Sequence, residues 1–136
     1  MGSGFRVNVD GVELHGVLLE DAAPRWTALL KSGLPLEREL LNFRWGGQAA
    51  YFLEAALAEA GTEVENPVTF YPRMSICIRP PREVVFAYGQ AQARSLTIPA
   101  AFACHVADLD GDLDKWVKVL STLPRAGGRT IQMALE

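Results

Sequence analysis

The sequence lacks most of the features that identify an enzyme or a membrane protein at first sight. No stretch approaches the roughly 20 consecutive apolar residues that a membrane-spanning helix requires. There is no Gly-rich phosphate loop, no nucleophile elbow and no paired Cys or His spacing for zinc, and two histidines are too few for a three-histidine metal site. These absences predict a protein without a metal ion, without an organic cofactor and without membrane contact.

Charge and cysteine content are also low. The chain has 13 basic and 16 acidic residues, a net charge of -3, and the two signs are mixed along it, which argues against a nucleic acid partner. Cys77 and Cys104 each lie in an apolar run, which is typical of reduced, buried thiols. Residues 1–4 show no secretion signal and are predicted to be a flexible start. We therefore expect a cytoplasmic protein.

The chain contains enough apolar residues to form a globular core, since 49% of its residues are hydrophobic. Its length predicts one domain that covers residues 1–136. Two helices are predicted. The first is capped by Asp21, has Pro24 in its first turn and stops at Gly33. The second is capped by Asp112 and ends before Pro124.

Short strand-like runs divided by glycine and proline make up most of the remaining chain. Asp10-Gly11 is a strong hairpin signal between the first two runs, Gly46-Gly47 predicts a turn or bulge, Gly89 closes a later strand, and residues 63–73 are predicted to form an irregular loop. The last run needs a partner, most simply the N-terminal hairpin. The predicted strands are residues 5–9, 12–19, 37–44, 49–53, 74–79, 83–88, 95–98, 102–109 and 130–135.

Many short strands with frequent turns and only two helices indicate a mainly β protein. The predicted fold is a closed or nearly closed antiparallel barrel, with the two helices covering it.

Arg44 is the strongest candidate for a ligand-binding residue. Its guanidinium is a fork-shaped donor, and it stands beside Trp45 and two glycines whose backbone a ligand can approach closely. This arrangement suits a carboxylate, a carbonyl or a twisted amide, and Gln48 offers a neutral donor and acceptor to the same ligand. A rim arginine paired with Glu37 or Glu39 explains Arg44 equally well.

The corner at Glu65 and Asn66 carries a carboxylate and an amide before a proline, on a stiff loop suited to the opposite wall of a pocket. A turn in which Asn66 bonds its own backbone is the structural alternative. Tyr71 and Tyr88 are candidates for the pocket lining, although aromatics near strand ends are ordinarily core or rim residues. The predicted catalytic residues are Arg44, Gln48 and Glu65, and the predicted ligand-binding residues are Trp45, Asn66, Tyr71 and Tyr88.

The sequence predicts different environments for the two histidines. His15 shares a strand face with Glu13, so the imidazole is a candidate general base oriented by that carboxylate, or else a half-exposed strand residue. His105 stands in an apolar run and is expected to be a satisfied core histidine.

The order of elements resembles the cyclophilin-like barrel. Five short blocks look like the successive blocks of a bacterial cyclophilin-like family of unknown function: LLEDAAPR (18–25), RWGGQA (44–49), ENP (65–67), YP (71–72) and AYG (87–89). The resemblance implies a small bacterial barrel associated with the catabolism of small amides and amino acids. The chain has Gln48 where the family has an acid, and residues 100–102 where it has an Asn-His pair, which argues against acid–base chemistry at those positions.

Three classes of function follow. The first is a small-molecule enzyme or binding protein, acting on a small amide, cyclic amide or carboxylate metabolite held by Arg44 at the barrel rim. The second is a peptidyl-prolyl isomerase or peptide-binding module, in which Arg44 and Gln48 contact a proline peptide. The third is a non-catalytic interaction domain that forms a homo-oligomer through exposed strand edges.

Overall fold

The computed structural model describes residues 2–42, 47–55, 57, 63–80, 83–92, 103–122 and 129–136. The predictions for Arg44 and Trp45, and for a strand at residues 95–98, lie outside these residues. The strands are β1 (Gly4–Val9), β2 (Val12–Leu18), β3 (Leu36–Asn42), β4 (Gly47–Leu53), β5 (Pro67–Val68), β6 (Phe70–Tyr71), β7 (Ser75–Arg79), β8 (Glu83–Gln92), β9 (Ala103–Asp110) and β10 (Arg129–Leu135). The helices are α1 (Pro24–Ser32) and α2 (Leu113–Ser121).

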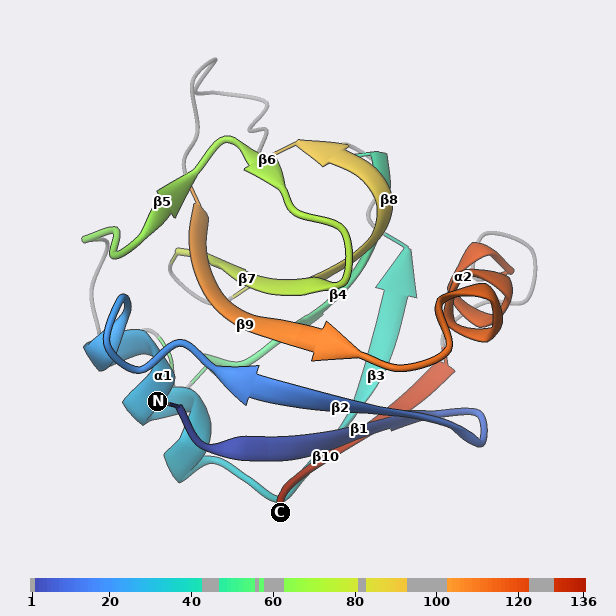
Figure 1. Ribbon diagram of the computed structural model, residues 1–136, viewed down its shortest axis with the longest axis horizontal. Coiled ribbons are helices and arrows are strands. Elements are labelled where there is room, and N and C mark those ends of the chain that lie inside the picture. Colours follow the sequence, from blue (N-terminus) through green and yellow to red (C-terminus); the bar gives the residue numbers. More distant parts are fainter. Residues whose placement is uncertain are drawn as a thin grey trace.

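Eight antiparallel strands form a closed barrel, which confirms the predicted fold class. Their order is β2-β1-β10-β3-β4-β8-β7-β9, and β9 pairs with β2 to close the ring. The two short strands lie outside the ring, β5 against β9 and β6 against β8. Figure 1 shows α1 and α2 on opposite sides of this barrel, with β1, β2 and β10 crossing its lower part.

The N-terminal hairpin and its pairing with the last strand are as predicted. Asp10 and Gly11 both have positive φ, 54° and 84°, as a two-residue hairpin turn of the primed type requires. Val7 then pairs with Leu14 on one side and with Met133 on the other. The last strand also pairs with β3, so β10 lies between two strands from the beginning of the chain.

The second helix begins as predicted, whereas the first is capped differently. The Asp112 side chain accepts a hydrogen bond from the Lys115 backbone N–H at 3.1 Å. The N-cap residue of α1 is Ala23 rather than the predicted Asp21, and Ala23 makes no side-chain capping bond. Pro24 and Gly33 stand at the first position and at the C-cap, as predicted. In the described part of the chain, neither helix is long and apolar enough to cross a bilayer.

Two strand predictions need correction. Strand β8 does not end at Gly89 but continues to Gln92, because its far end pairs with both β4 and β6. The predicted irregular loop at residues 63–73 contains β5 and β6, which add to the barrel strands. The bulge predicted near Gly46-Gly47 is present as a shift of register between Gly47 and Ala49 where β4 pairs with β8.

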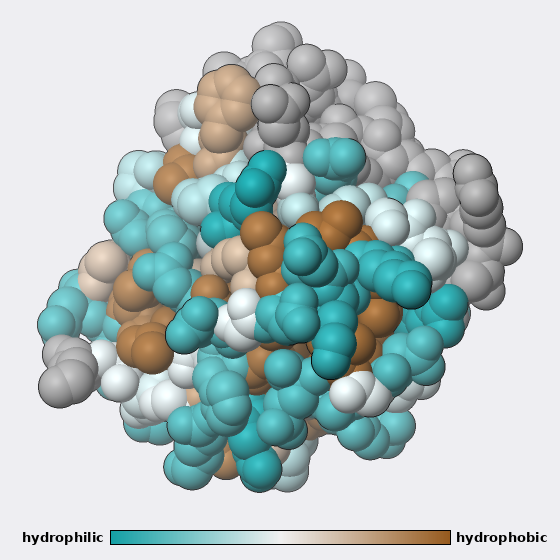
Figure 2. Space-filling model, turned by 45° about the vertical axis from the view of Figure 1, so that its right-hand side comes forward, coloured by the Kyte–Doolittle hydropathy of each residue, from teal (hydrophilic) through white to brown (hydrophobic). Residues whose placement is uncertain are grey.

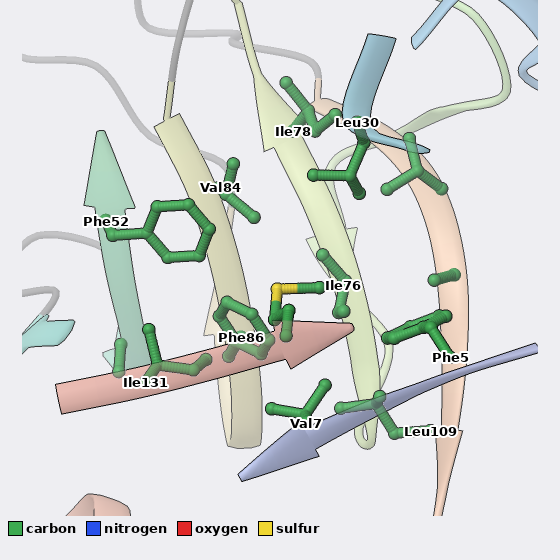
Figure 3. Packing of buried hydrophobic residues seen from close by; sticks show 14 of the residues in the cluster. Phe5, Val7, Leu30, Phe52, Ile76, Ile78, Val84, Phe86, Leu109 and Ile131 are labelled. Carbon is green, nitrogen blue, oxygen red and sulfur yellow. The ribbon is translucent and has the colours of Figure 1, made fainter. Parts of the chain in front are cut away.

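The main core fills the barrel interior, with side chains from opposite walls meeting at its centre (Figure 3). Phe86 lies there with its ring centroid 5.8 Å from that of Phe52 and 6.3 Å from that of Trp116 on α2. Trp26 and Leu30 from α1 are buried in the same cluster. A smaller cluster lies on the other face of β4, β7 and β8 and consists of Ala49, Tyr71, Cys77, Val85, Ala87 and Ala103.

Candidate functional site

Gln48, one of the predicted catalytic residues, lies over the backbone of β8. A Cβ atom built on Gly89 would come within 2.0 Å of Gln48 Oε1 and 3.0 Å of Gln48 Cβ. Real Cβ atoms do not approach other atoms so closely, so the amide occupies space that only a glycine leaves. The absent side chain of Gly89 therefore positions the exposed Gln48 amide at the bulge of β4.

Replacing Gly89 by alanine is expected to displace Gln48. The new methyl group takes the place of the amide, and because Gln48 is exposed its side chain can swing away, so we expect a stability loss of about 1 kcal/mol. The Gln48 side-chain amide resonances in an NMR spectrum should shift. Gly33→Ala is the matched control, because the nearest atom to its added Cβ is 3.6 Å away; a Gln48 resonance unmoved in Gly89→Ala would contradict the geometry.

Glu65, predicted to be catalytic, caps helix α1. Its Oε1 atom accepts hydrogen bonds from the backbone N–H groups of Arg25 and Trp26, at 2.9 and 3.1 Å. These are unsatisfied donors of the first helical turn, where a carboxylate is also favoured by the helix dipole. The Trp26 indole N–H donates to the Glu63 carbonyl oxygen at 2.9 Å. The segment before β5 is thus attached to the start of α1, which explains why Asp21 is not needed as the cap.

Replacing Glu65 by alanine is expected to lower the free energy of unfolding by about 1 kcal/mol, the usual cost of losing a helix cap. Glu65→Gln keeps an acceptor oxygen and should lose less. Glu63 is the matched control, because its carboxylate is 84% exposed and only pairs with Arg25, so Glu63→Ala should change stability by less than about 0.5 kcal/mol. Equal losses in Glu65→Ala and Glu63→Ala, measured by urea unfolding, would show that the cap is not stabilising.

Asn66 joins the same segment to β9. Its backbone has a φ of +48°, and its side chain donates to the His105 carbonyl oxygen at 3.0 Å. The Asn66 carbonyl oxygen in turn accepts from the His105 N–H at 3.1 Å. The side-chain bond to Asn66's own backbone, considered as an alternative, is therefore replaced by a bond across to another strand. His105 itself is largely buried, with Nε2 bonded to Asp108 Oδ1 at 2.8 Å.

The two tyrosines predicted to line the pocket lie in different clusters. Tyr71 is 3% exposed and belongs to the smaller cluster, whereas Tyr88 is 7% exposed and belongs to the barrel interior. Burial raises the pKa of both phenols. The structure therefore does not bring Tyr71 and Tyr88 together on one surface.

An open groove lies elsewhere, on the outer face of the barrel where β1, β10 and β3 pair. Its volume is about 520 Å³. Polar side chains form its floor in one row across four strands: Glu13 pairs with Asn8, Asn8 with Gln132, and Gln132 with Glu37. Arg6 lines the groove beside this row. In Figure 2 hydrophilic residues cover most of the lower part of the molecule, the height at which β1 and β10 lie in Figure 1.

Most polar side chains of the groove make no contact that would stabilise the described part of the fold. Arg6, Glu13, Glu37 and Gln132 are exposed, and their side chains form no hydrogen bond or ion pair with another described residue. Asn8 is partly engaged, since its Oδ1 atom accepts from the Gly11 N–H at 3.2 Å. A cation, two carboxylates and an amide thus face one open groove without partners in the described chain.

Next to the groove, His15 is held by a carboxylate, but not by the predicted Glu13. His15 Nδ1 is in hydrogen-bond contact with Glu136 Oε1. His15 pairs with Arg6 across β1 and β2, so the two side chains share the outer face. Sequence alternation places Arg6, Asn8 and Gln132 on a polar strand face, but only the pairing of β1 with β10 brings them together.

These features define an antiparallel β-barrel with a polar groove on its outer surface. No protein-family model and no curated protein matches the chain. A structure of McbB in complex with tryptophan is similar, with a TM-score of 0.79 and 16% identity over 96% of this chain. The solution structure of the hypothetical protein AF2241 from Archaeoglobus fulgidus is similar over 99% of this chain and 95% of its own, with a TM-score of 0.66 and 14% identity.

The chain corresponds to 44% of the McbB chain, less than half of its length. At these identities the two likenesses show a shared barrel fold.

Proposed function

We propose that this chain is a small-molecule-binding barrel domain of cyclophilin-like type, and that its ligand is a small metabolite with a carboxylate or amide group. The observation that carries the proposal is the groove of about 520 Å³, which is lined by Arg6, Glu13 and Gln132, whose side chains have no partner among the described residues. Its volume is within the range of roughly 300–1,000 Å³ found for small-molecule sites.

The groove chemistry supports a ligand that carries both an acceptor and a donor. The Arg6 guanidinium can bind a carboxylate or a carbonyl oxygen through two parallel N–H groups. Glu13 lies two residues along β2 from His15, the residue opposite Arg6, and can accept from an ammonium or amide N–H. An amino acid or a cyclic amide has both groups close together. The tryptophan bound to the structurally similar McbB belongs to the same class of ligand.

Arg44, which comes between β3 and β4 in the sequence, remains a second proposed anchor. The argument for it is the sequence beside it, since Arg44 lies outside the described residues. Gln48, held over Gly89, is the neighbour that would share a ligand with it. The two sites predict different effects of substitution, so one experiment separates them.

The experiment is a thermal-shift and NMR titration with amino acids, cyclic amides, hydantoins and short carboxylic acids. A ligand in the groove should raise the melting temperature of the wild-type chain, and Arg6→Ala should weaken its binding at least about tenfold, the loss expected for a charge-assisted hydrogen bond. Arg25→Ala, an exposed arginine on α1 outside the groove, is the control and should bind normally.

Three outcomes are informative. Loss of binding in Arg6→Ala alone supports the groove. Loss in Arg44→Ala alone moves the site to the rim and overturns the assignment to Arg6. No binding by any member of the panel would overturn the proposal that this barrel binds such metabolites.

A further inference from the structure

We propose that His15, Glu136 and Arg6 form a proton-transfer site beside the groove, next to the part of it that Arg6 lines. In this site His15 Nε2 removes a proton from the bound ligand, and Arg6 holds the negatively charged oxygen that results. The inference rests on the proposed function, because it takes the same class of ligand in the same groove. It adds an activity to a surface that so far has only been assigned binding.

The Glu136 side chain reaches His15 across an intervening strand. The Glu136 backbone N–H donates to the Gly4 carbonyl oxygen at 3.1 Å, which extends the β10–β1 pairing by one residue. From there the carboxylate passes over β1 to His15 on β2. A Cβ atom on Gly4 would lie 3.0 Å from Glu136 Oε2, so the glycine leaves the room in which the carboxylate crosses. The pairing of β10, β1 and β2 therefore brings the Glu136 carboxylate into contact with Nδ1 of His15.

This contact determines which nitrogen of His15 faces the ligand. A carboxylate is only an acceptor, so neutral His15 carries its proton on Nδ1 and donates it to Glu136. The lone pair is then on Nε2, and no described residue contacts that atom through a hydrogen bond. The side chain of His15 is 63% exposed, which leaves Nε2 accessible. A proton acceptor oriented by a carboxylate is the arrangement that general-base catalysis uses.

Arg6 supplies the complementary charge. It pairs with His15 in the strand register, where side chains on one face lie about 5 Å apart. Because the Arg6 guanidinium has no ion-pair partner in the described chain, it is available to stabilise an anion that forms beside His15. Asp110 lies opposite His15 on β9 and adds a negative charge near this position. Glu13 lies two residues along β2 from His15. It can hold an N–H of the ligand.

A base beside a cation suits a ligand with an acidic C–H next to a carbonyl group, as in a cyclic amide. The C–H bond breaks, its proton moves to His15 Nε2, and the electron pair moves onto the carbonyl oxygen to give an enolate held by Arg6. Return of a proton from the imidazolium to the same carbon regenerates the carbonyl compound. Atoms and electrons balance without an oxidant, a reductant or a co-reactant.

The test is hydrogen–deuterium exchange of 5-methylhydantoin at its ring C–H, followed by NMR in D₂O. The wild-type chain should accelerate exchange about 100-fold over the same concentration of free imidazole, the lower range for general acid–base catalysis. His15→Gln should reduce the rate to that of the imidazole solution. His105→Gln is the matched control and should leave exchange unchanged, because His105 is outside the groove and its Nε2 is engaged by Asp108.

Glu136 acts through His15, so it is a positioning residue and needs a readout beyond rate. Nitrogen-15 NMR of the His15 ring reports where the proton is. The wild-type chain should show Nδ1–H, and Glu136→Gln, which keeps an acceptor oxygen, should preserve it. Glu136→Ala should shift the ring toward Nε2–H and slow exchange. A ring that carries its proton on Nε2 in the wild-type chain would overturn the assignment.

Binding of the same hydantoin, measured in parallel, separates the two proposals. If the probe binds in an Arg6-dependent manner but exchange is no faster than with imidazole, the proton-transfer inference is overturned and the proposed function stands. If exchange is accelerated equally in His15→Gln, the base lies elsewhere and the inference is also overturned. If neither binding nor exchange occurs with this probe, the inference fails, and the wider ligand panel decides the proposed function.

Discussion

Replacing Phe86 by alanine is expected to lower the free energy of unfolding by about 3–5 kcal/mol, the range found for removal of a buried phenylalanine. Phe86 is fully buried in the barrel interior. Its ring contacts Phe52 from β4 and Trp116 from α2, so the cavity would separate the helix from two strands. The close packing of a protein interior allows only partial collapse around such a cavity.

The measurement is equilibrium unfolding in urea, followed by tryptophan fluorescence and circular dichroism. Phe70→Ala is the control, because that ring is 63% exposed, and we expect its stability to change by less than about 0.5 kcal/mol. If Phe86→Ala and Phe70→Ala had similar midpoints, the barrel interior could not be the main core.

Raising the pH above 9.0 is expected to destabilise the fold through its buried thiols and phenols. Burial raises the pKa of the Cys77 thiol from 9.0 to about 12. The unfolded chain therefore releases this proton first, so the stabilisation is fully present below pH 9.0 and is lost as the pH rises toward 12. The slope for one such group is about 1.4 kcal/mol per pH unit. Burial also raises the pKa of Cys104, Tyr71 and Tyr88, which act in the same direction.

Urea unfolding at a series of alkaline pH values measures this slope. Cys77→Ala removes one ionising group and should make the decline with pH shallower, although it lowers stability at neutral pH by leaving a small cavity. His105→Gln changes none of these thiols and phenols and should keep the wild-type slope. A wild-type stability that stays constant up to pH 11 would contradict the burial of these groups.

The parts of the fold predicted correctly depend on local chemistry. Asp10-Gly11 can adopt the positive φ angles of a tight hairpin, and Asp112 reaches the N–H of Lys115 within one helical turn. Alternating apolar residues in Phe5, Val7 and Val9 predict which strand face is buried. The count of short strands was then sufficient to indicate a barrel.

The parts that could not be predicted depend on residues that are distant in sequence. Helix α1 is capped by Glu65, 40 residues after Arg25, and no local pattern indicates that partner. Gly89 was predicted to end a strand, since glycine weakens strands, but here it makes room for the side chain of Gln48. Short strands such as β5 and β6 carry too few residues for a periodic signal.

In the candidate site, too, residues that are distant in sequence form the contacts that could not be predicted. Glu65 and Asn66 were predicted to be catalytic and ligand-binding residues, and the contacts observed for them are structural, with the start of α1 and with β9. The groove was not predicted, because Arg6 and Gln132 are separated by most of the chain and meet only through the register of β1 and β10. His15 was noted, but the prediction chose Glu13, its neighbour in sequence, instead of Glu136.

The position of β10 between β1 and β3 determines when this barrel can form. Both neighbours belong to the first 42 residues, whereas β10 begins at Arg129, so the ring stays open until residues 129–135 are present. During synthesis, the edges of β1 and β3 that pair with β10 have no partner until β10 has emerged. Contacts between residues so far apart in sequence favour slow folding. Association of these edges with other chains is therefore expected to compete with correct folding.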